Sequence, residues 1–140
     1  MVDTSRVHKK IEQILNALEY DGSEISVVIM DNAGIAALNR QYRDIEGPTN
    51  VLSFPMQEGD FADITPGLLG DVVLSAEYAQ TEAQEAGITL DERVSQLLIH
   101  GILHLIGYDH EQGEDQAKIM EQKSLELIRT IENNTMLNAF

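Results

Sequence analysis

The sequence predicts an α+β fold, with α and β layers in which a small mixed β-sheet is covered by helices. Short runs of branched aliphatic residues alternate with longer segments in which apolar residues recur at helical spacing. The predicted order is helix, strand, helix, strand, strand, helix, helix, helix. One of the late helices is apolar on nearly every side, so we expect it to be buried. This combination is typical of layers around one core, and it leaves the strand order open.

The N-terminal part of the chain predicts a helix, a buried strand and a second helix. Over residues 5–19, apolar side chains recur every three or four positions, which is the period of an amphipathic helix. The branched run ISVVIM at residues 25–30 is typical of a buried strand. Asp31 and Asn32 follow directly, and we expect them to cap a helix that continues toward Tyr42.

The middle of the chain predicts two strands separated by a polar loop. After a Gly-Pro break, VLSFP at residues 51–55 predicts a strand that Pro55 ends or confines to a sheet edge. Residues 56–66 are polar and predict the most mobile loop of the chain. LLGDVVLS at residues 68–75 predicts the third strand.

The C-terminal half predicts three consecutive helices. The first covers residues 77–86 and ends at the glycine that follows. The second begins at Thr89, where Thr89 and Glu92 have the spacing of a capping box. The third covers residues 116–131, and we expect the tail over residues 133–140 to fray.

Composition and charge limit the classes of function. The 140 residues fit one domain, 1–140, with its own core. Because there is no cysteine, any metal must be held by histidine and carboxylate. The net charge of −15 repels polyanions and argues against non-specific binding of nucleic acid. No signal segment or membrane-spanning run is visible, so we expect a soluble cytoplasmic protein that does not bind membranes.

Three of the four histidines fall within the segment HGILHLIGYDH, in the predicted buried helix and the loop after it. His100 and His104 lie one helical turn apart, so both rings can reach one cation at about 2.0–2.1 Å. Gly107 lets the chain leave the helix with positive φ, after which His110 can turn back to the same point. Three histidines leave a fourth position for water, which is the arrangement of a catalytic zinc site.

This spacing favours a metal centre over three histidines with ordinary hydrogen bonds. Zinc suits an all-nitrogen tetrahedral site best, with nickel, copper and cobalt as alternatives. Zinc peptidases with the same first spacing carry a glutamate base directly after the first histidine, where this chain has Gly101. We expect Gly101 to serve packing. Asp109 and Glu111 are candidates for a replacement base, and each is better explained as a group that orients a ligand ring or as a solvated carboxylate.

Three stretches carry a resemblance to a known family. HGILHLIGYDH, LNRQYRDIEGPTNVLSFP and LLGDVVLS resemble, in their order and spacing, the signatures of the YbeY family. That family consists of bacterial single-strand-specific metallo-endoribonucleases involved in ribosomal RNA maturation. The resemblance spans residues 25–127, and the family motif itself begins His-Gly. It implies a small α/β layer fold in which the metal-binding helix packs on a mixed sheet.

The resemblance also implies roles for individual residues. His100, His104 and His110 would bind one zinc ion per chain, and His100 would be catalytic through the metal-bound water at the open position. Arg43 would act in RNA processing, since a guanidinium can hold a phosphate and stabilise charge that develops on it. Without the resemblance, Arg43 is a surface cation at a helix end. The implied partners are single-stranded RNA, including ribosomal RNA, and the small ribosomal subunit or its assembly factors.

Two other functions remain open. A metallohydrolase of another class, such as a peptidase or amidase, would use the same metal spacing but lacks the glutamate base. A non-enzymatic ribosome-assembly factor with a structural zinc ion would need a fourth protein ligand. For a nuclease, the net charge of −15 requires a local basic groove, to which Arg40, Arg43 and Arg93 can contribute if the fold gathers them. The alternative is a ribosomal partner rich in basic protein, which would recruit the chain through its acidic surface.

Overall fold

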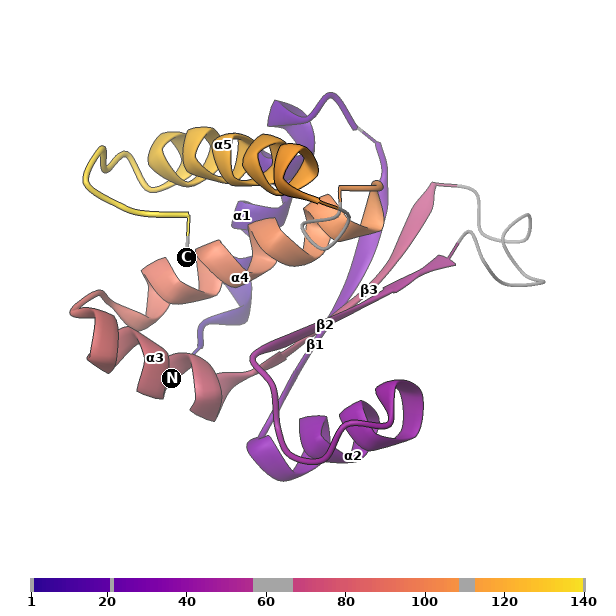
Figure 1. Ribbon diagram of the computed structural model, residues 1–140. Helices are drawn as coiled ribbons and strands as arrows, with labels where there is room; N and C mark the ends of the chain where they lie inside the picture. Colours follow the sequence, from indigo (N-terminus) through magenta and orange to yellow (C-terminus); the bar gives the residue numbers. More distant parts are fainter. Residues whose placement is uncertain (1, 21, 57–66, 109–112, 140) are drawn as a thin grey trace.

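A computed structural model describes residues 2–20, 22–56, 67–108 and 113–139 of the chain (Figure 1). Within these residues, five helices surround one three-stranded sheet. In chain order the elements are α1 (Thr4–Ala17), β1 (Glu24–Met30), α2 (Asn32–Arg43), β2 (Val51–Pro55), β3 (Leu68–Ser75), α3 (Ala76–Ala86), α4 (Leu90–Leu105) and α5 (Glu114–Ile131). The predicted α+β class and the predicted element order are therefore confirmed.

The sheet is mixed, with strand order β1-β3-β2. β3 pairs in parallel with β1 and antiparallel with β2, so β3 is the central strand. β2 lies at one edge, as expected for a strand that ends in proline. Its last residue, Pro55, stands opposite Gly70 in the ladder.

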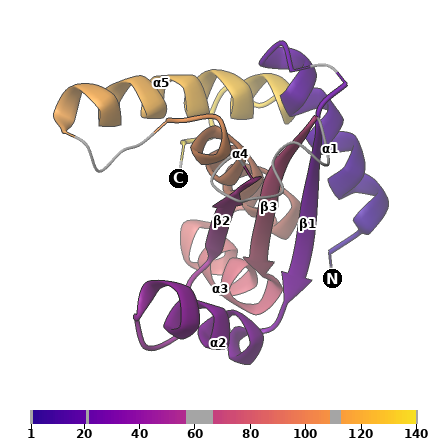
Figure 2. The ribbon, with the colours of Figure 1, turned by 90° about the vertical axis from the view of Figure 1, so that its right-hand side faces the viewer.

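The two faces of the sheet are covered by different helices, as Figures 1 and 2 show. On β3, Val72 and Leu74 point into the larger core, which α1, α4 and α5 complete. Val73 points the other way and packs with Leu52 of β2 and Ile35 of α2. This alternation follows from the two-residue period of a strand, and it places α4 and α2 on opposite faces.

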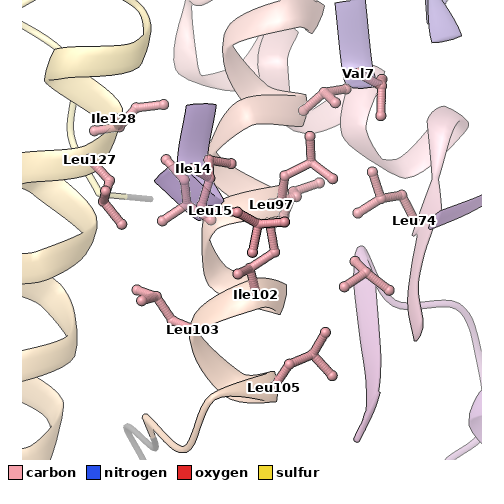
Figure 3. Close-up of a cluster of buried hydrophobic side chains, with 14 of the residues drawn as sticks. Val7, Ile14, Leu15, Leu74, Leu97, Ile102, Leu103, Leu105, Leu127 and Ile128 are labelled. Carbon is pink, nitrogen blue, oxygen red and sulfur yellow. The ribbon is translucent and has the colours of Figure 1, made fainter. Parts of the chain in front are cut away.

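Helix α4 is the centre of the larger core. Eleven of its residues are buried, as predicted for a helix that is apolar on nearly every side. It contacts α1, α3 and α5 as well as the sheet. Figure 3 shows the side chains that meet around it: Leu97, Ile102, Leu103 and Leu105 of α4, with Val7, Ile14 and Leu15 of α1, Leu74 of β3, and Leu127 and Ile128 of α5. None of the helices in the described part of the chain is long and apolar enough to cross a membrane.

The C-terminal tail is packed, so the prediction that it frays was wrong. Leu137 and Ala139 are only 4% and 6% exposed. Two backbone carbonyls of the tail accept side-chain hydrogen bonds: Gln96 Nε2 donates to Asn138 at 2.8 Å, and Arg129 Nε donates to Leu137 at 3.1 Å. The tail therefore binds both α4 and α5. The polar loop predicted over residues 56–66 lies, beyond Met56, outside the described residues.

Candidate metal centre

The helix that carries two of the predicted ligands begins at a complete capping box. Thr89 Oγ1 accepts from the Glu92 backbone N–H at 3.1 Å, and Glu92 Oε1 accepts from the Thr89 N–H at 2.9 Å. This reciprocal pair satisfies two of the backbone donors that a helix start leaves without partners. The hydrogen bond from the Thr89 backbone, with further ones from the Asn134 and Thr89 side chains, lowers the pKa of Glu92 below its ordinary value. Hydrogen bonds between Thr89 and Glu92 therefore fix the N-terminus of α4.

Glu92→Gln is expected to make the stability of the protein less dependent on pH. A carboxyl whose pKa is lowered by folding stabilises the protein above its unfolded pKa, and this contribution disappears as the pH falls through the folded value. The variant should therefore melt below the wild type at pH 7, and the difference should shrink at pH 3. The difference in melting temperature is measured by thermal melts of both proteins at pH 7 and pH 3. Glu85→Gln, on the exposed surface of α3, controls for the loss of one charge. An unchanged difference at pH 3 would contradict the assignment.

Two glycines let α4 pack directly on the sheet. A Cβ on Gly101 would lie 2.8 Å from Val72 Cγ1 and 3.3 Å from Ser53 Oγ, so the helix contacts β3 and β2 at this point without a side chain between them. Ser53 Oγ also donates to the Gly101 carbonyl at 3.1 Å. On the strand side, a Cβ on Gly70 would lie 2.8 Å from Leu105 Cδ2. The expectation that Gly101 serves packing is confirmed.

On this tightly packed helix, the rings of the two helical histidines face each other. His100 and His104 are half-buried on a helix that is otherwise almost fully buried. Their Nε2 atoms are 3.1 Å apart, and the ring centroids are 4.5 Å apart with an angle of 76° between the planes. Two nitrogen ligands of one tetrahedral zinc ion lie about 3.3 Å apart, because each is 2.0–2.1 Å from the ion. The observed separation fits a shared metal ion.

The chain leaves this helix through a Schellman motif. Tyr108 N donates to the Leu103 carbonyl at 2.9 Å, and Gly107 N donates to the His104 carbonyl at 3.1 Å. Gly107 has φ +107°, as predicted from the sequence. The motif turns the chain back directly after the second histidine.

The third predicted ligand, His110, lies outside the described residues, as do Asp109 and Glu111. In the described ranges, no three His, Asp or Glu side chains gather closely enough to hold a metal ion. The triad of His100, His104 and His110 therefore stays a prediction, of which the structure describes the first two members and their mutual geometry.

The predicted phosphate-binding residue, Arg43, is exposed in the last turn of α2, on the opposite face of the sheet from α4. Arg40 is exposed in the same turn. Tyr42 lies between them in sequence, is 61% exposed, and its ring meets that of Phe54 edge-on at 5.2 Å. Within the described residues, neither arginine forms an ion pair, so both guanidinium groups are available to an anionic ligand.

The fold does not gather the three arginines that could have contributed to a basic groove, because Arg93 lies apart from the other two. It is 6% exposed, and its Nη2 forms an ion pair with Glu82 of α3 at 3.2 Å. Its Nη1 also donates to Gln96 at 2.7 Å. Since α3 packs against the N-terminal half of α4, this guanidinium is buried where it neutralises a carboxylate and cannot reach RNA.

Some residues near the histidines had no role in the sequence-based prediction. Gln96 lies one turn before His100 and binds the tail. Arg129 binds the tail from α5. The sequence did contain a pattern that could have drawn attention to Arg129. Glu121, Leu125 and Arg129 are spaced four residues apart, so they lie along one face of α5. This face mixes acidic, apolar and basic side chains, so it lacks the hydrophobic periodicity by which a helix face is recognised in a sequence.

The chain is similar over most of its length to known proteins. A family model described as "Endoribonuclease YbeY" matches residues 1–132. The Endoribonuclease YbeY of Geobacter sulfurreducens is 49% identical over 137 residues, which are 97% of this chain and 91% of the relative. That of Geobacter metallireducens is 46% identical with the same coverage. The solution structure of TM1509 from Thermotoga maritima matches with a TM-score of 0.67 and 26% identity, over 95% of this chain and 85% of that one.

Proposed function

Because the chain belongs to the YbeY family of endoribonucleases, we propose that it cleaves single-stranded RNA with a zinc ion bound by His100, His104 and His110. The observation that carries this proposal is the 3.1 Å separation of the two Nε2 atoms on a helix fixed against the sheet. A zinc ion held by these residues would supply a Lewis acid for a phosphoryl oxygen and would lower the pKa of water near it toward neutrality.

The protein contributes positioning. The capped start of α4, its packing on two glycines and its Schellman end hold both rings before any substrate arrives. A side chain at position 101 would point toward Val72 in the sheet, because the Cβ direction of Gly101 leads there. A glutamate base of the peptidase type has no room at that position, which favours phosphodiester over peptide hydrolysis.

Arg43 is proposed to bind a phosphate of the RNA. It is exposed in one turn with Arg40, and within the described residues neither guanidinium forms an ion pair, although the exposed carboxylates of Asp44 and Glu46 follow directly. We further propose that the substrate is ribosomal RNA, processed at the small ribosomal subunit in the cytoplasm. That part is supported by the resemblance of the three signatures. The acidic surface would favour docking on basic ribosomal proteins.

The test is cleavage of an end-labelled single-stranded RNA by the zinc-loaded protein. Cleavage is expected to stop when a chelator removes the metal and to return when zinc is restored, while a duplex of the same sequence stays intact. The ends of the products separate two mechanisms, since a 2′,3′-cyclic phosphate would show that the ribose hydroxyl attacks the phosphorus. Cleavage that persists in full after zinc removal would refute the proposal.

Arg43→Gln is expected to lower kcat/KM about 10- to 100-fold, because a charge-assisted hydrogen bond to phosphate contributes roughly 1.5–3 kcal/mol. Zinc content should stay near one ion per chain. Arg40→Gln, in the same exposed turn, is the matched control and should have a smaller effect. If Arg43→Gln instead loses its zinc or its fold, the residue is structural and its assignment to phosphate binding is wrong.

A further inference from the structure

A cavity of about 610 Å³ adjoins the candidate metal centre. His100 of α4 lines it on one side. On the other side, α5 contributes Ala117, Glu121, Leu125 and Arg129, each four residues after the last, so that they form one continuous ridge. The space is thus a groove between two helices, and one of the predicted zinc ligands forms part of its wall.

The C-terminal tail forms part of the wall of this groove. Asn138 and Ala139 line it, and the hydrogen bonds from Gln96 and Arg129 hold the tail across α4 and α5. The family model ends at residue 132, so this wall lies outside the part of the chain that the model matches. The tail therefore shapes the groove beside one of the predicted zinc ligands.

Arg129 gives the groove a cation. Its Nε donates to the Leu137 carbonyl, which fixes the guanidinium at the groove wall. Within the described residues, the Arg129 side chain forms no other hydrogen bond or ion pair, so its two Nη groups remain available. Leu125 and Ala139 supply apolar wall, and Glu121 supplies a hydrogen-bond acceptor. An apolar slot with one cation and one acceptor matches a nucleotide, whose base is flat and apolar on its faces and whose phosphate is anionic.

We propose that this groove binds one unstacked nucleotide of the RNA strand next to the scissile phosphate, with Arg129 contacting its phosphate. The proposal rests on the proposed function for its substrate. It explains a preference for single strands in physical terms, because a base that is paired and stacked in a duplex cannot enter a groove between two helices. Arg129 is thus a further substrate-binding residue, on a different element from Arg43.

The first experiment measures binding without catalysis. Adenosine 5′-monophosphate (AMP) is titrated at millimolar concentrations into the zinc-free, isotope-labelled full chain, and amide shifts are followed by NMR. Shifts are expected at Glu121, Leu125 and Arg129. Ala117→Phe fills the groove and should abolish them, whereas Gln116→Phe places the same ring one position away and should not. Absent shifts, or shifts that Ala117→Phe leaves unchanged, would overturn the proposal.

The second experiment measures cleavage. Arg129→Gln is expected to raise KM about tenfold with little change in kcat, because a contact made equally in the ground and transition states changes KM alone. Arg129→Lys keeps the charge and should restore most of the affinity. Lys118→Gln, an exposed cation on the same helix, is the control. If the lysine variant is as impaired as the glutamine variant, Arg129 only holds the tail and its phosphate contact is rejected.

The two proposals fail in distinguishable ways. Normal RNA cleavage with an unchanged KM in the groove variants would reject the groove and leave the nuclease function standing. Binding of AMP in the groove by a protein that cleaves no RNA would reject the nuclease function and leave the groove as a nucleotide site.

Discussion

Gly70→Ala is expected to prevent stable folding. Gly70 lies in β3 with φ +148°, and an added Cβ would lie 2.3 Å from the Phe54 carbonyl oxygen and 2.8 Å from Leu105 Cδ2. The first atom belongs to the backbone of the paired strand β2, so it cannot move without breaking the ladder. We expect a loss of about 4 kcal/mol or more, which is exceptional for one substitution. Against a typical total stability of roughly 5–15 kcal/mol, the loss would leave little native protein.

Urea denaturation measures the effect, and Gly101→Ala provides the comparison. There the nearest atom is Val72 Cγ1 at 2.8 Å, a side chain, so overpacking should cost about 1–3 kcal/mol. Val72→Ala removes that atom and should make the double variant more stable than the sum of the two losses predicts. Leu105→Ala should not rescue Gly70→Ala, because the backbone oxygen remains. A loss below about 1 kcal/mol for Gly70→Ala would contradict this account.

The contact between Gly70 and Leu105 also links the stability of the fold to the candidate metal centre. Leu105, which fills the space above Gly70, follows His104 directly in the last turn of α4. A shift of that turn away from β3 would move the His104 ring relative to His100. If the histidine pair holds the proposed zinc ion, any folded fraction of Gly70→Ala should therefore bind zinc more weakly than Gly101→Ala does.

The parts of the fold that were predictable are those determined by residues close together in the sequence. The bounds of β3 coincide with the predicted residues 68–75, because an apolar run lies between a glycine and a serine that caps the next helix. α4 was predicted from its capping box and its apolar surface, both of which lie within the helix. The strand order was not predictable, since the same run can pair in parallel or antiparallel, and the choice depends on partners far along the chain.

In the candidate site, too, features that depend on nearby residues were predicted, and features that depend on distant residues were not. The close approach of His100 and His104 was predicted because their spacing of four residues is local to one helix. The burial of Arg93 was not predictable, because its partner, Glu82, comes from a different helix. The packed tail was missed for the same reason, since it depends on hydrogen bonds from Gln96 and Arg129, far from it in sequence or on other elements.

His104→Ala is expected to have the largest effect on activity. If His100 and His104 share one zinc ion, the loss of one ring removes a ligand and weakens binding of the metal. A bound metal contributes several kcal/mol of transition-state stabilisation, so cleavage of single-stranded RNA should fall on the order of a thousandfold or more. The zinc content of the purified protein, measured alongside the cleavage rate, should fall well below one ion per chain.

The fourth histidine supplies the matched control for this experiment. His8 lies exposed on α1, where its Nε2 is 3.1 Å from Glu12, and His8→Ala should keep both zinc and activity. Thermal melts of the two variants without metal should be similar, because His104 is half-buried and its loss leaves the apolar core of α4 intact. A His104→Ala protein that keeps its zinc and cleaves RNA at the wild-type rate would show that the histidine pair does not hold the catalytic metal. If that variant cleaves at full rate without zinc, the nuclease activity comes from a contaminant of the preparation.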